Sequence, residues 1–212
     1  MTDTLVPKAA DTTRQKILRA AFMEFYRNGF QGGGLNDIVA AAGTTKGALF
    51  HHFTGKQDLG YAVVDEIIGP LLLQRWLDPL TGRLTERFTD AADPVAVLQR
   101  TFRTLVKHDM DTGHWLLGCP LNNMAQEMSP LDDGFRSRID ALYTTWRKGF
   151  AAAFATGIAS GTVATTVNPR SVAALLVASQ MGIWGTGKSS QSKTVMTQAT
   201  DAICDYLNTL KA

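Results

Sequence analysis

Three sets of residues in this 212-residue chain have types and spacings that could do chemistry, and the first set would bind phosphate. The segment 182–189 matches the pattern G-x-x-x-x-G-K-[ST] and ends in Gly187, Lys188 and Ser189. In nucleotide-binding enzymes this pattern forms a loop of backbone N–H groups around the phosphates, directly after a buried parallel strand. Residues 169–181 instead have the alanine- and leucine-rich pattern of a helix, so we interpret the glycines as a turn between helices. A nucleotide-binding enzyme that uses Gly187-Lys188-Ser189 is kept as the main alternative.

The second set consists of cysteine and histidine side chains. Cys119 begins a predicted helix, where the positive helix end stabilises a thiolate and makes the thiol more reactive. A free cysteine is more commonly a small buried apolar residue, and both interpretations stay open. His108 and His114 lie nearby without an evident fourth ligand, so no metal site is predicted. The sequence has no catalytic-serine motif and no paired catalytic carboxylates, so nothing in it favours an enzyme, and no cofactor is expected.

The third set is a polar surface that could contact nucleic acid. Two short helices are predicted at 35–42 and 46–52, joined by a tight turn at Gly43. Such a pair forms a helix-turn-helix, whose second helix enters the major groove with its N-terminal residues toward the base edges. Ile38, Leu49 and Phe53 are expected to face inward. The outer face is then polar, with Thr45, Lys46, His51 and His52.

These residues must be positioned by helices, because apolar spacings of three and four recur along almost the whole chain and predict an all-α fold. After a polar tail at 1–11, a first helix runs to about residue 28 and is stopped by Gly29. A fourth helix begins at Lys56 and is expected to kink or break at Gly69-Pro70. Further helices are predicted at about 94–110, 120–128, 131–160, 169–184 and 192–210, with a connector at 111–118 and a turn at 185–190.

Composition sets further limits. Twenty-one Lys and Arg against nineteen Asp and Glu give a formal net charge of +2, so positive charge for a nucleic acid must be local. The two cysteines lie far apart and indicate a reducing compartment. The N-terminus has no apolar signal segment, and the most apolar stretch, 172–187, is shorter than the roughly 20 residues of a membrane helix. A cytoplasmic protein without a membrane partner is expected.

Residues 12–60 resemble the DNA-binding domain of TetR-type transcriptional repressors. Three blocks carry the resemblance: 13–30, with Phe25 and Gly29-Phe30; 37–43; and 45–59, with Lys56 and Leu59. The resemblance implies a three-helix DNA-binding domain at 1–55, and a helical ligand-binding and dimerisation domain at 56–212, about nine helices in all. The DNA-contacting residues that it implies are Gly34, Thr44, Thr45, Lys46, Gly47, Phe50, His51, His52 and Lys56. Most of these contacts would position the protein on phosphates rather than read bases.

Two positions depart from the family pattern. The family usually has tyrosine where this chain has Phe50, so the hydroxyl that would bind a phosphate is missing. The family often has threonine at Gly34, which caps the second helix, and glycine is a weaker cap without a side-chain acceptor. Each change is expected to lower DNA affinity by about 1 kcal/mol. They keep open a further alternative, a helical adaptor without DNA binding.

The resemblance also covers function. It implies a repressor that binds a palindromic operator as a homodimer, with recognition helices about 34–36 Å apart, and that a small-molecule inducer releases from DNA. The last two helices would form the dimer interface, and the inducer would act by shifting the fourth helix. Cys119 falls in a Gly-Cys segment found in one branch of the family. The candidate ligand-binding residues are Phe102, Trp115, Cys119, Asn122, Asn123, Gln126, Trp146 and Phe150.

Overall fold

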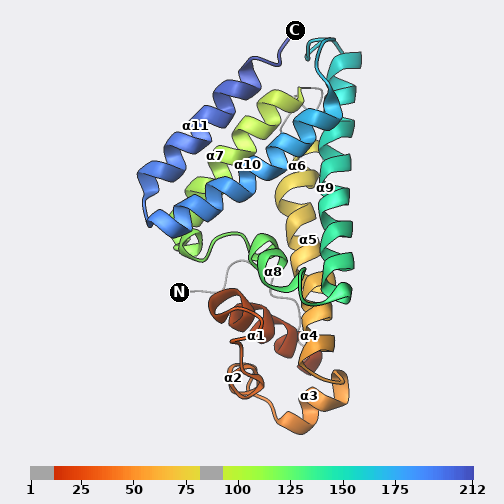
Figure 1. The fold of residues 1–212 in the computed structure, drawn as a ribbon, viewed down its shortest axis with the longest axis vertical. Coiled ribbons are helices and arrows are strands. Elements are labelled where there is room, and N and C mark those ends of the chain that lie inside the picture. The colour runs from red at the N-terminus through yellow and green to blue at the C-terminus, as the bar shows by residue number, and fades with distance from the viewer. Residues whose placement is uncertain (1–11, 82–92) are drawn as a thin grey trace. The chain divides into compact units, whose positions relative to one another are not determined.

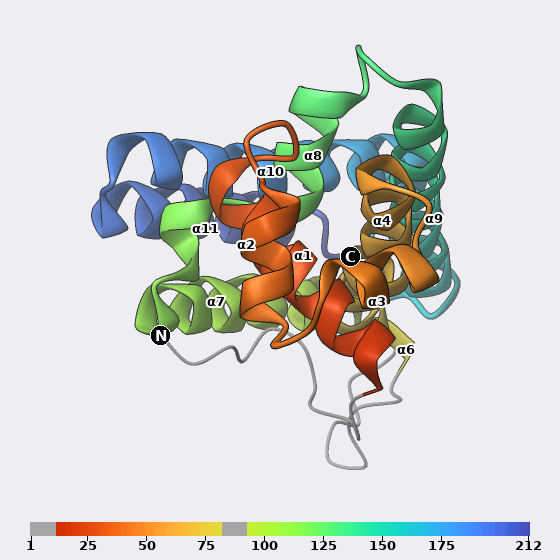
Figure 2. The same ribbon diagram turned by 90° about the horizontal axis from the view of Figure 1, so that it is seen from below.

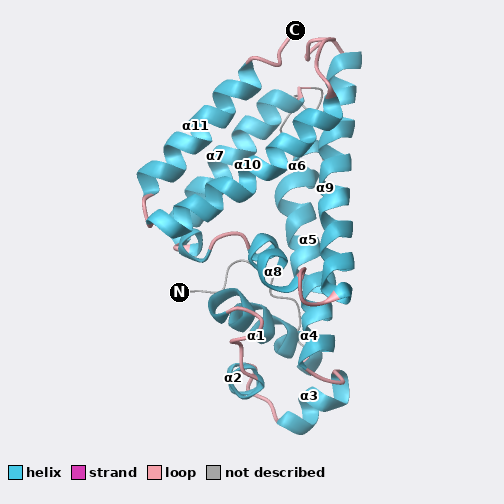
Figure 3. Cartoon of the chain, in the orientation of Figure 1, coloured by secondary structure: helices cyan, strands magenta, loops and turns pink. Residues whose placement is uncertain are grey.

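The computed structural model describes residues 12–81 and 93–212, and it confirms the all-α class (Figure 1). Within these residues the backbone is helices and loops, with one isolated bridge between Val163 and Lys211 (Figure 3). Nine α-helices are present in this part of the chain when the continuous run 56–81 is counted as one. None of them is long and apolar enough to cross a bilayer. The predicted polar tail at 1–11 lies outside the described residues.

The chain divides into two compact units. The N-terminal unit contains residues 12–71 and 120–141, and the C-terminal unit contains 72–81, 93–119 and 142–212 of the described chain. The helix-turn-helix therefore shares its unit with a later segment, 120–141. The chain passes from one unit to the other at 71–72, 119–120 and 141–142.

The first three helices of the N-terminal unit begin and end where local signals predict. Helix α1 (Thr13–Asn28) starts with a capping box between Thr12 and Gln15 and ends at Gly29, whose φ of 78° favours glycine. Helices α2 (Leu35–Ala41) and α3 (Lys46–His52) are joined through Gly43 at a φ of 60°. Helix α1 packs against α2, α3 and α4 (Figure 2).

Of the kink or break expected at Gly69-Pro70, the break does not occur, because the helical run continues from 56 to 81. It consists of α4 (Lys56–Val63), α5 (Gly69–Leu72) and α6 (Asp78–Thr81), joined by π-helical turns at Val64–Ile68 and Leu73–Leu77. The N–H of Gly69 donates to Val64, five residues back. Proline lacks an N–H and its ring clashes with the preceding α-helical turn. A wider π turn directly before the proline accommodates both effects. The same arrangement precedes Pro79, where the N–H of Asp78 donates to Leu73.

The remaining helices are α7 (Pro94–Thr112), α8 (Pro120–Met128), α9 (Asp133–Ala159), α10 (Pro169–Ser190) and α11 (Lys193–Asn208). Asp93 and Asn168 cap α7 and α10, each before a proline at the first helical position. The predicted connector contains a short 3₁₀ turn, His114–Leu117. Helix α9 contributes its first residues to the N-terminal unit and the others to the C-terminal unit.

The predicted turn at 185–190 is wrong, because α10 continues through it to Ser190. The glycine at 187 is buried, and a Cβ atom there would collide with Met196 of α11. Gly187 therefore allows α10 and α11 to approach closely. Close packing against α11 outweighs the low helix propensity of the two glycines in this segment.

Candidate nucleic-acid interface

Helix α3 presents most of its predicted contact residues to solvent. Leu49 and Phe53 are 0% and 3% exposed and hold the helix against the unit, as expected. Thr45 caps the helix, since its Oγ1 accepts from the N–H of Ala48 at 3.1 Å. Thr45, Lys46, Gly47, Phe50 and His51 are exposed, and Thr44 and His52 are half-buried. Exposed polar groups at the start of a short helix are what groove entry requires.

Gly47 and Phe50 are both exposed on the outer face of α3. A Cβ atom at Gly47 would meet only the Thr45 hydroxyl, at 3.8 Å, so nothing in the protein demands glycine there. Phe50 is 54% exposed, which is unusual for a phenylalanine in a seven-residue helix. Both residues are therefore free to contact a molecule outside the chain.

Gly34 starts α2 with extended backbone angles, φ −94° and ψ 133°, and without a side-chain cap. Its N–H donates to Glu24 Oε1 at 3.3 Å, and Glu24 also accepts from Asn28 at 2.9 Å. The missing side-chain cap agrees with the prediction that glycine caps this helix weakly. Residues other than glycine can adopt these angles, so the backbone does not require glycine here.

Lys56 lies at the start of α4, as predicted, but its ammonium group already has contacts inside the unit. Its Nζ donates to the carbonyl of Gln31 at 2.9 Å and lies 5.1 Å from the centre of the Phe30 ring. The first N–H groups of α4 have no side-chain cap, because the residue before the helix is Gly55. Lys56 thus connects a helix N-terminus that suits an anion to the loop after α1.

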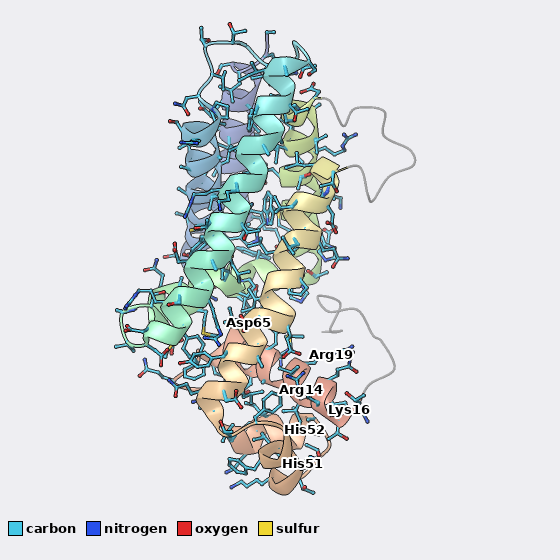
Figure 4. The ribbon with its side chains drawn as sticks, turned by 90° about the vertical axis from the view of Figure 1, so that its right-hand side faces the viewer. Arg14, Lys16, Arg19, His51, His52 and Asp65 are labelled. Carbon is cyan, nitrogen blue, oxygen red and sulfur yellow. The ribbon has the colours of Figure 1, made fainter. Side chains whose placement is uncertain are left out.

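Two further contacts position α3 and α4, and sequence reasoning missed both. Arg14 donates from two nitrogens to the Glu66 carboxylate, each at 2.5 Å, and its guanidinium lies 5.1 Å from the centre of the Phe53 ring. The hydrogen bond with Arg14 lowers the pKa of Glu66, and the same bond raises the pKa of Arg14. Figure 4 shows Arg14, Lys16 and Arg19 on α1, in the same unit as His51 and His52. Exposed Lys16 adds a positive charge to this surface.

The segment 120–141 supplies carboxylates to the same unit. Glu127 of α8 accepts from the backbone N–H groups of Phe30 and Gln31 at 2.8 and 2.7 Å. Asp132 accepts from the Tyr61 hydroxyl at 2.7 Å and from the side chain of Gln57. The sequence does not indicate a role for Glu127. Its partners lie 97 and 96 residues away, where no sequence spacing points to them.

Asp132 and Arg138 fix α4 to the start of α9. Backbone and Tyr61 hydrogen bonds lower the pKa of Asp132, and the bond with Asp132 raises the pKa of Tyr61. Arg138 donates to Asp65 at 2.9 Å, and its guanidinium lies 4.2 Å from the centre of the Tyr61 ring. The first turns of α4, which follow the recognition helix, are thereby bound to residues that come much later in the chain.

The predicted ligand-binding residues fall into different units. Phe102, Trp146 and Phe150 are buried in the C-terminal unit around Trp76, with ring centres 4.9, 5.4 and 6.3 Å from its own. Trp115 and Cys119 are buried in the same unit. Asn122, Asn123 and Gln126 belong to the N-terminal unit, where Gln126 is exposed and Asn123 borders a small hollow with Phe22 and Glu127.

Two residues of this aromatic cluster, Trp76 itself and Trp184, are absent from the predicted ligand-binding residues. Trp184 packs on Trp76 at 5.9 Å, and its Nε1 donates to Asp109 at 2.6 Å. Asp109 also accepts from Arg75 at 2.7 and 2.8 Å. Asp109 groups with His108 and His114 as potential metal ligands. Both oxygens of the only carboxylate in that group are bound by protein donors, including a cation, which does not suit a metal ion.

The phosphate-loop pattern at 182–189 lies inside α10. Backbone N–H groups within a helix bond to carbonyls four residues back, so they cannot surround a phosphate. The Thr186 hydroxyl also donates to the Gly182 carbonyl, at 2.7 Å. The geometry on which the nucleotide-binding alternative depends is therefore absent from this segment.

Comparisons with known proteins agree with the helix-turn-helix. Residues 17–63 match the family "Bacterial regulatory proteins, tetR family", and residues 94–203 match "Tetracyclin repressor-like, C-terminal domain". The chain is 29% identical to the transcriptional regulator AcuR of Cereibacter sphaeroides over 167 residues, 77% of this chain and 71% of AcuR. It is 28% identical to the transcriptional repressor DhaR of Mycobacterium sp. strain GP1 over 175 residues, 82% of this chain and 81% of DhaR.

Solved structures share the fold. A regulatory protein TetR from Rhodobacter sphaeroides superposes with a TM-score of 0.77 at 24% identity, over 92% of this chain and 98% of that one. The reduced form of E. coli NemR gives a TM-score of 0.76 at 19% identity, over 94% and 98%. With a helix-turn-helix in the N-terminal unit and family matches in both halves, this chain belongs to the TetR family of DNA-binding transcriptional regulators.

Proposed function

We propose that the protein is a cytoplasmic repressor that binds a palindromic operator as a homodimer and that a small molecule releases from DNA. The observation that carries this proposal is the outer face of α3, where Phe50 is 54% exposed and a Cβ atom at Gly47 would meet only the Thr45 hydroxyl. A surface glycine beside a lysine lets the backbone come close to a phosphate, and an exposed ring can pack against sugar or base.

Each predicted contact has a distinct task in this proposal. Lys46 neutralises a phosphate, while Thr45 and Thr44 place the start of α3 against the DNA backbone. His51 and His52 lie in the last turn of α3, where the resemblance implies contacts with the groove and with phosphate. Lys56 and the uncapped N-terminus of α4 form a second phosphate contact. Gly34 starts α2 without a side-chain cap, so its backbone would contact a phosphate directly.

The dimer interface is assigned to α10 and α11. The outer face of α10 carries exposed small and apolar side chains one turn apart, at Ala174, Leu175, Ala178 and Gly182. Leu175 is 44% exposed, which suits a residue that a second copy covers. A two-fold axis at this face would pair two recognition helices on one side of a duplex.

Release from DNA is assigned to the segment 120–141. This segment is joined along the chain to the C-terminal unit at both ends, and it contacts Phe30 and Tyr61 of the N-terminal unit through Glu127 and Asp132. A ligand that favours another arrangement of the C-terminal unit would pull on these contacts and on α4. Only the difference in its affinity for the two arrangements can release DNA.

A gel-shift titration with DNA from upstream of the protein's own gene tests the proposal. We expect a specific shift that a scrambled duplex of equal length does not give, and light scattering should show two protomers per duplex. A protein that stays monomeric, or that binds both duplexes equally, would contradict the proposal and favour an adaptor.

A further inference from the structure

Three buried side-chain atoms of the C-terminal unit have no hydrogen-bond partner among the described residues. They are the Tyr143 hydroxyl, Nε1 of Trp146 and Oε1 of Gln180. Trp146 and Gln180 are only 1% and 3% exposed. Folded proteins pair nearly all buried polar atoms, so three such atoms in one unit call for an explanation.

The three atoms belong to one region of the unit. Tyr143 and Trp146 are three residues apart on α9 and therefore share a helix face. Gln180 lies one turn before Trp184 on α10. The rings of Trp146 and Trp184 both pack on Trp76, at 5.4 and 5.9 Å, so the faces of α9 and α10 that carry the three atoms meet at the same aromatic cluster.

Two charged groups near these atoms, Asp109 and Arg147, already have partners within the protein, and Arg147 donates to the Thr144 hydroxyl at 3.0 Å. Asp109 is bound by Arg75 and by Nε1 of Trp184, so it offers no free charge to a ligand. Burial raises the pKa of Tyr143, which keeps its hydroxyl a neutral donor, with Cys119 and Arg147 as smaller influences. A charged molecule would lose much of its hydration among these buried side chains.

We infer that the aromatic cluster around Trp76 is the inducer site, and that it takes an uncharged, largely apolar ring molecule with one hydrogen-bond acceptor and one donor. Trp146 Nε1 and the Tyr143 hydroxyl donate to the acceptor, and Oε1 of Gln180 accepts from the donor. Trp76, Trp184 and the buried phenylalanines Phe102 and Phe150 contact the ring. This inference rests on the proposed ligand response and specifies its chemistry.

Calorimetric titration at neutral pH with four probes tests separately what the acceptor, the donor and a charge on the ligand contribute to binding. 4-Hydroxyacetophenone carries an acceptor and a donor on one ring, and acetophenone carries the acceptor alone. Ethylbenzene has the shape without either group, and 4-hydroxybenzoate adds a negative charge. We expect affinity to fall in the order 4-hydroxyacetophenone, acetophenone, ethylbenzene, with 4-hydroxybenzoate not bound.

Two variants delete the unpartnered atoms with little change of shape, Tyr143→Phe and Gln180→Met. Each variant should bind 4-hydroxyacetophenone about five- to tenfold more weakly than wild type, which corresponds to the loss of one hydrogen bond. Binding of ethylbenzene should be unchanged. Because neither atom has a partner in the free protein, neither variant should lower its melting temperature. The matched control is Trp184→Phe, which removes an indole N–H that is bonded to Asp109 and should lower the melting temperature.

Several outcomes overturn the inference. One is a melting temperature that falls in Tyr143→Phe and Gln180→Met as much as in Trp184→Phe, since the atoms would then be bonded within the free protein. Others are equal binding of 4-hydroxyacetophenone by wild type and both variants, tighter binding of 4-hydroxybenzoate, or no binding of any probe to wild type. The gel shift of ligand-free wild type tests the regulator proposal separately, so failure of one is distinguishable from failure of the other.

Discussion

Replacing Glu127 by glutamine tests how α8 holds the helix-turn-helix in place. The carboxylate accepts two backbone N–H bonds, from Phe30 and Gln31. A glutamine oxygen can replace one of them, but its amide NH₂ then faces the second N–H, so one bond to a charged acceptor is lost. Such a bond is worth roughly 1.5–3 kcal/mol, and the half-exposed position favours the lower value, about 1.5 kcal/mol.

The expected change follows from that magnitude. For a chain of this size, about 1.5 kcal/mol lowers the melting temperature by roughly 3–6 °C. DNA affinity should fall as well, because the Gln31 carbonyl that accepts from Lys56 belongs to the loop that Glu127 fixes. Calorimetry and a gel shift measure the two effects.

The matched control is Gln126→Ala on the same helix, where the side chain is exposed. It should change neither the melting temperature nor DNA binding. If Glu127→Gln behaves like this control, then the carboxylate does not stabilise the loop after α1 and the proposed route of release through α8 is refuted.

Three other predictions concern the DNA surface and its support. Lys46→Ala should weaken binding to every duplex and reduce the slope of log affinity against log salt by about 1, and an unchanged slope would exclude a phosphate contact. Gly47→Val should leave the melting temperature within about 1 °C, since the space around it is open, yet weaken DNA binding, and wild-type affinity would show that no close approach occurs. The Arg14 contact lowers the pKa of Glu66, so its stabilisation is fully present above the ordinary carboxyl value of 4.5 and is lost as pH falls through the lowered value. Above pH 4.5, wild type should therefore have a higher melting temperature than Glu66→Gln, by the equivalent of up to about 1 kcal/mol. The two melting temperatures should converge as the pH falls through the lowered pKa of Glu66. A difference that stays constant with pH would rule out the ion pair as its cause.

Sequence patterns predicted the helices best where local chemistry decides the ends. Asp93 and Asn168 each precede a proline, and both cap the helices expected there. At two places a helix continues where the sequence indicates an interruption, and the physical reasons differ. At Gly69-Pro70 a local π turn accommodates the proline, so the helix does not break. At 185–190 the close packing of Gly187 against Met196 outweighs the turn preference of glycine.

The exposure of the predicted contact residues needed little more than the helix-turn-helix pattern, because five of them lie on one short helix and share its local geometry. The contacts that hold this surface in place could not be predicted from the same pattern. Arg14 and Glu66 are 52 residues apart, and Glu127 reaches Gln31 across 96 residues. Pairs of this kind depend on how helices pack, and a single charged residue in a sequence does not indicate its partner.

The two π turns in the run 56–81 affect how this chain is aligned with its relatives. Each turn accommodates one residue more than an α-helical turn of equal rotation, which is how a single-residue insertion is absorbed in a helix without unfolding it. A relative whose corresponding helix is α-helical throughout should therefore need a one-residue gap within 64–68 and another within 73–77. An ungapped alignment would pair the wrong side chains, and assign Trp76 to a helix face that it does not occupy.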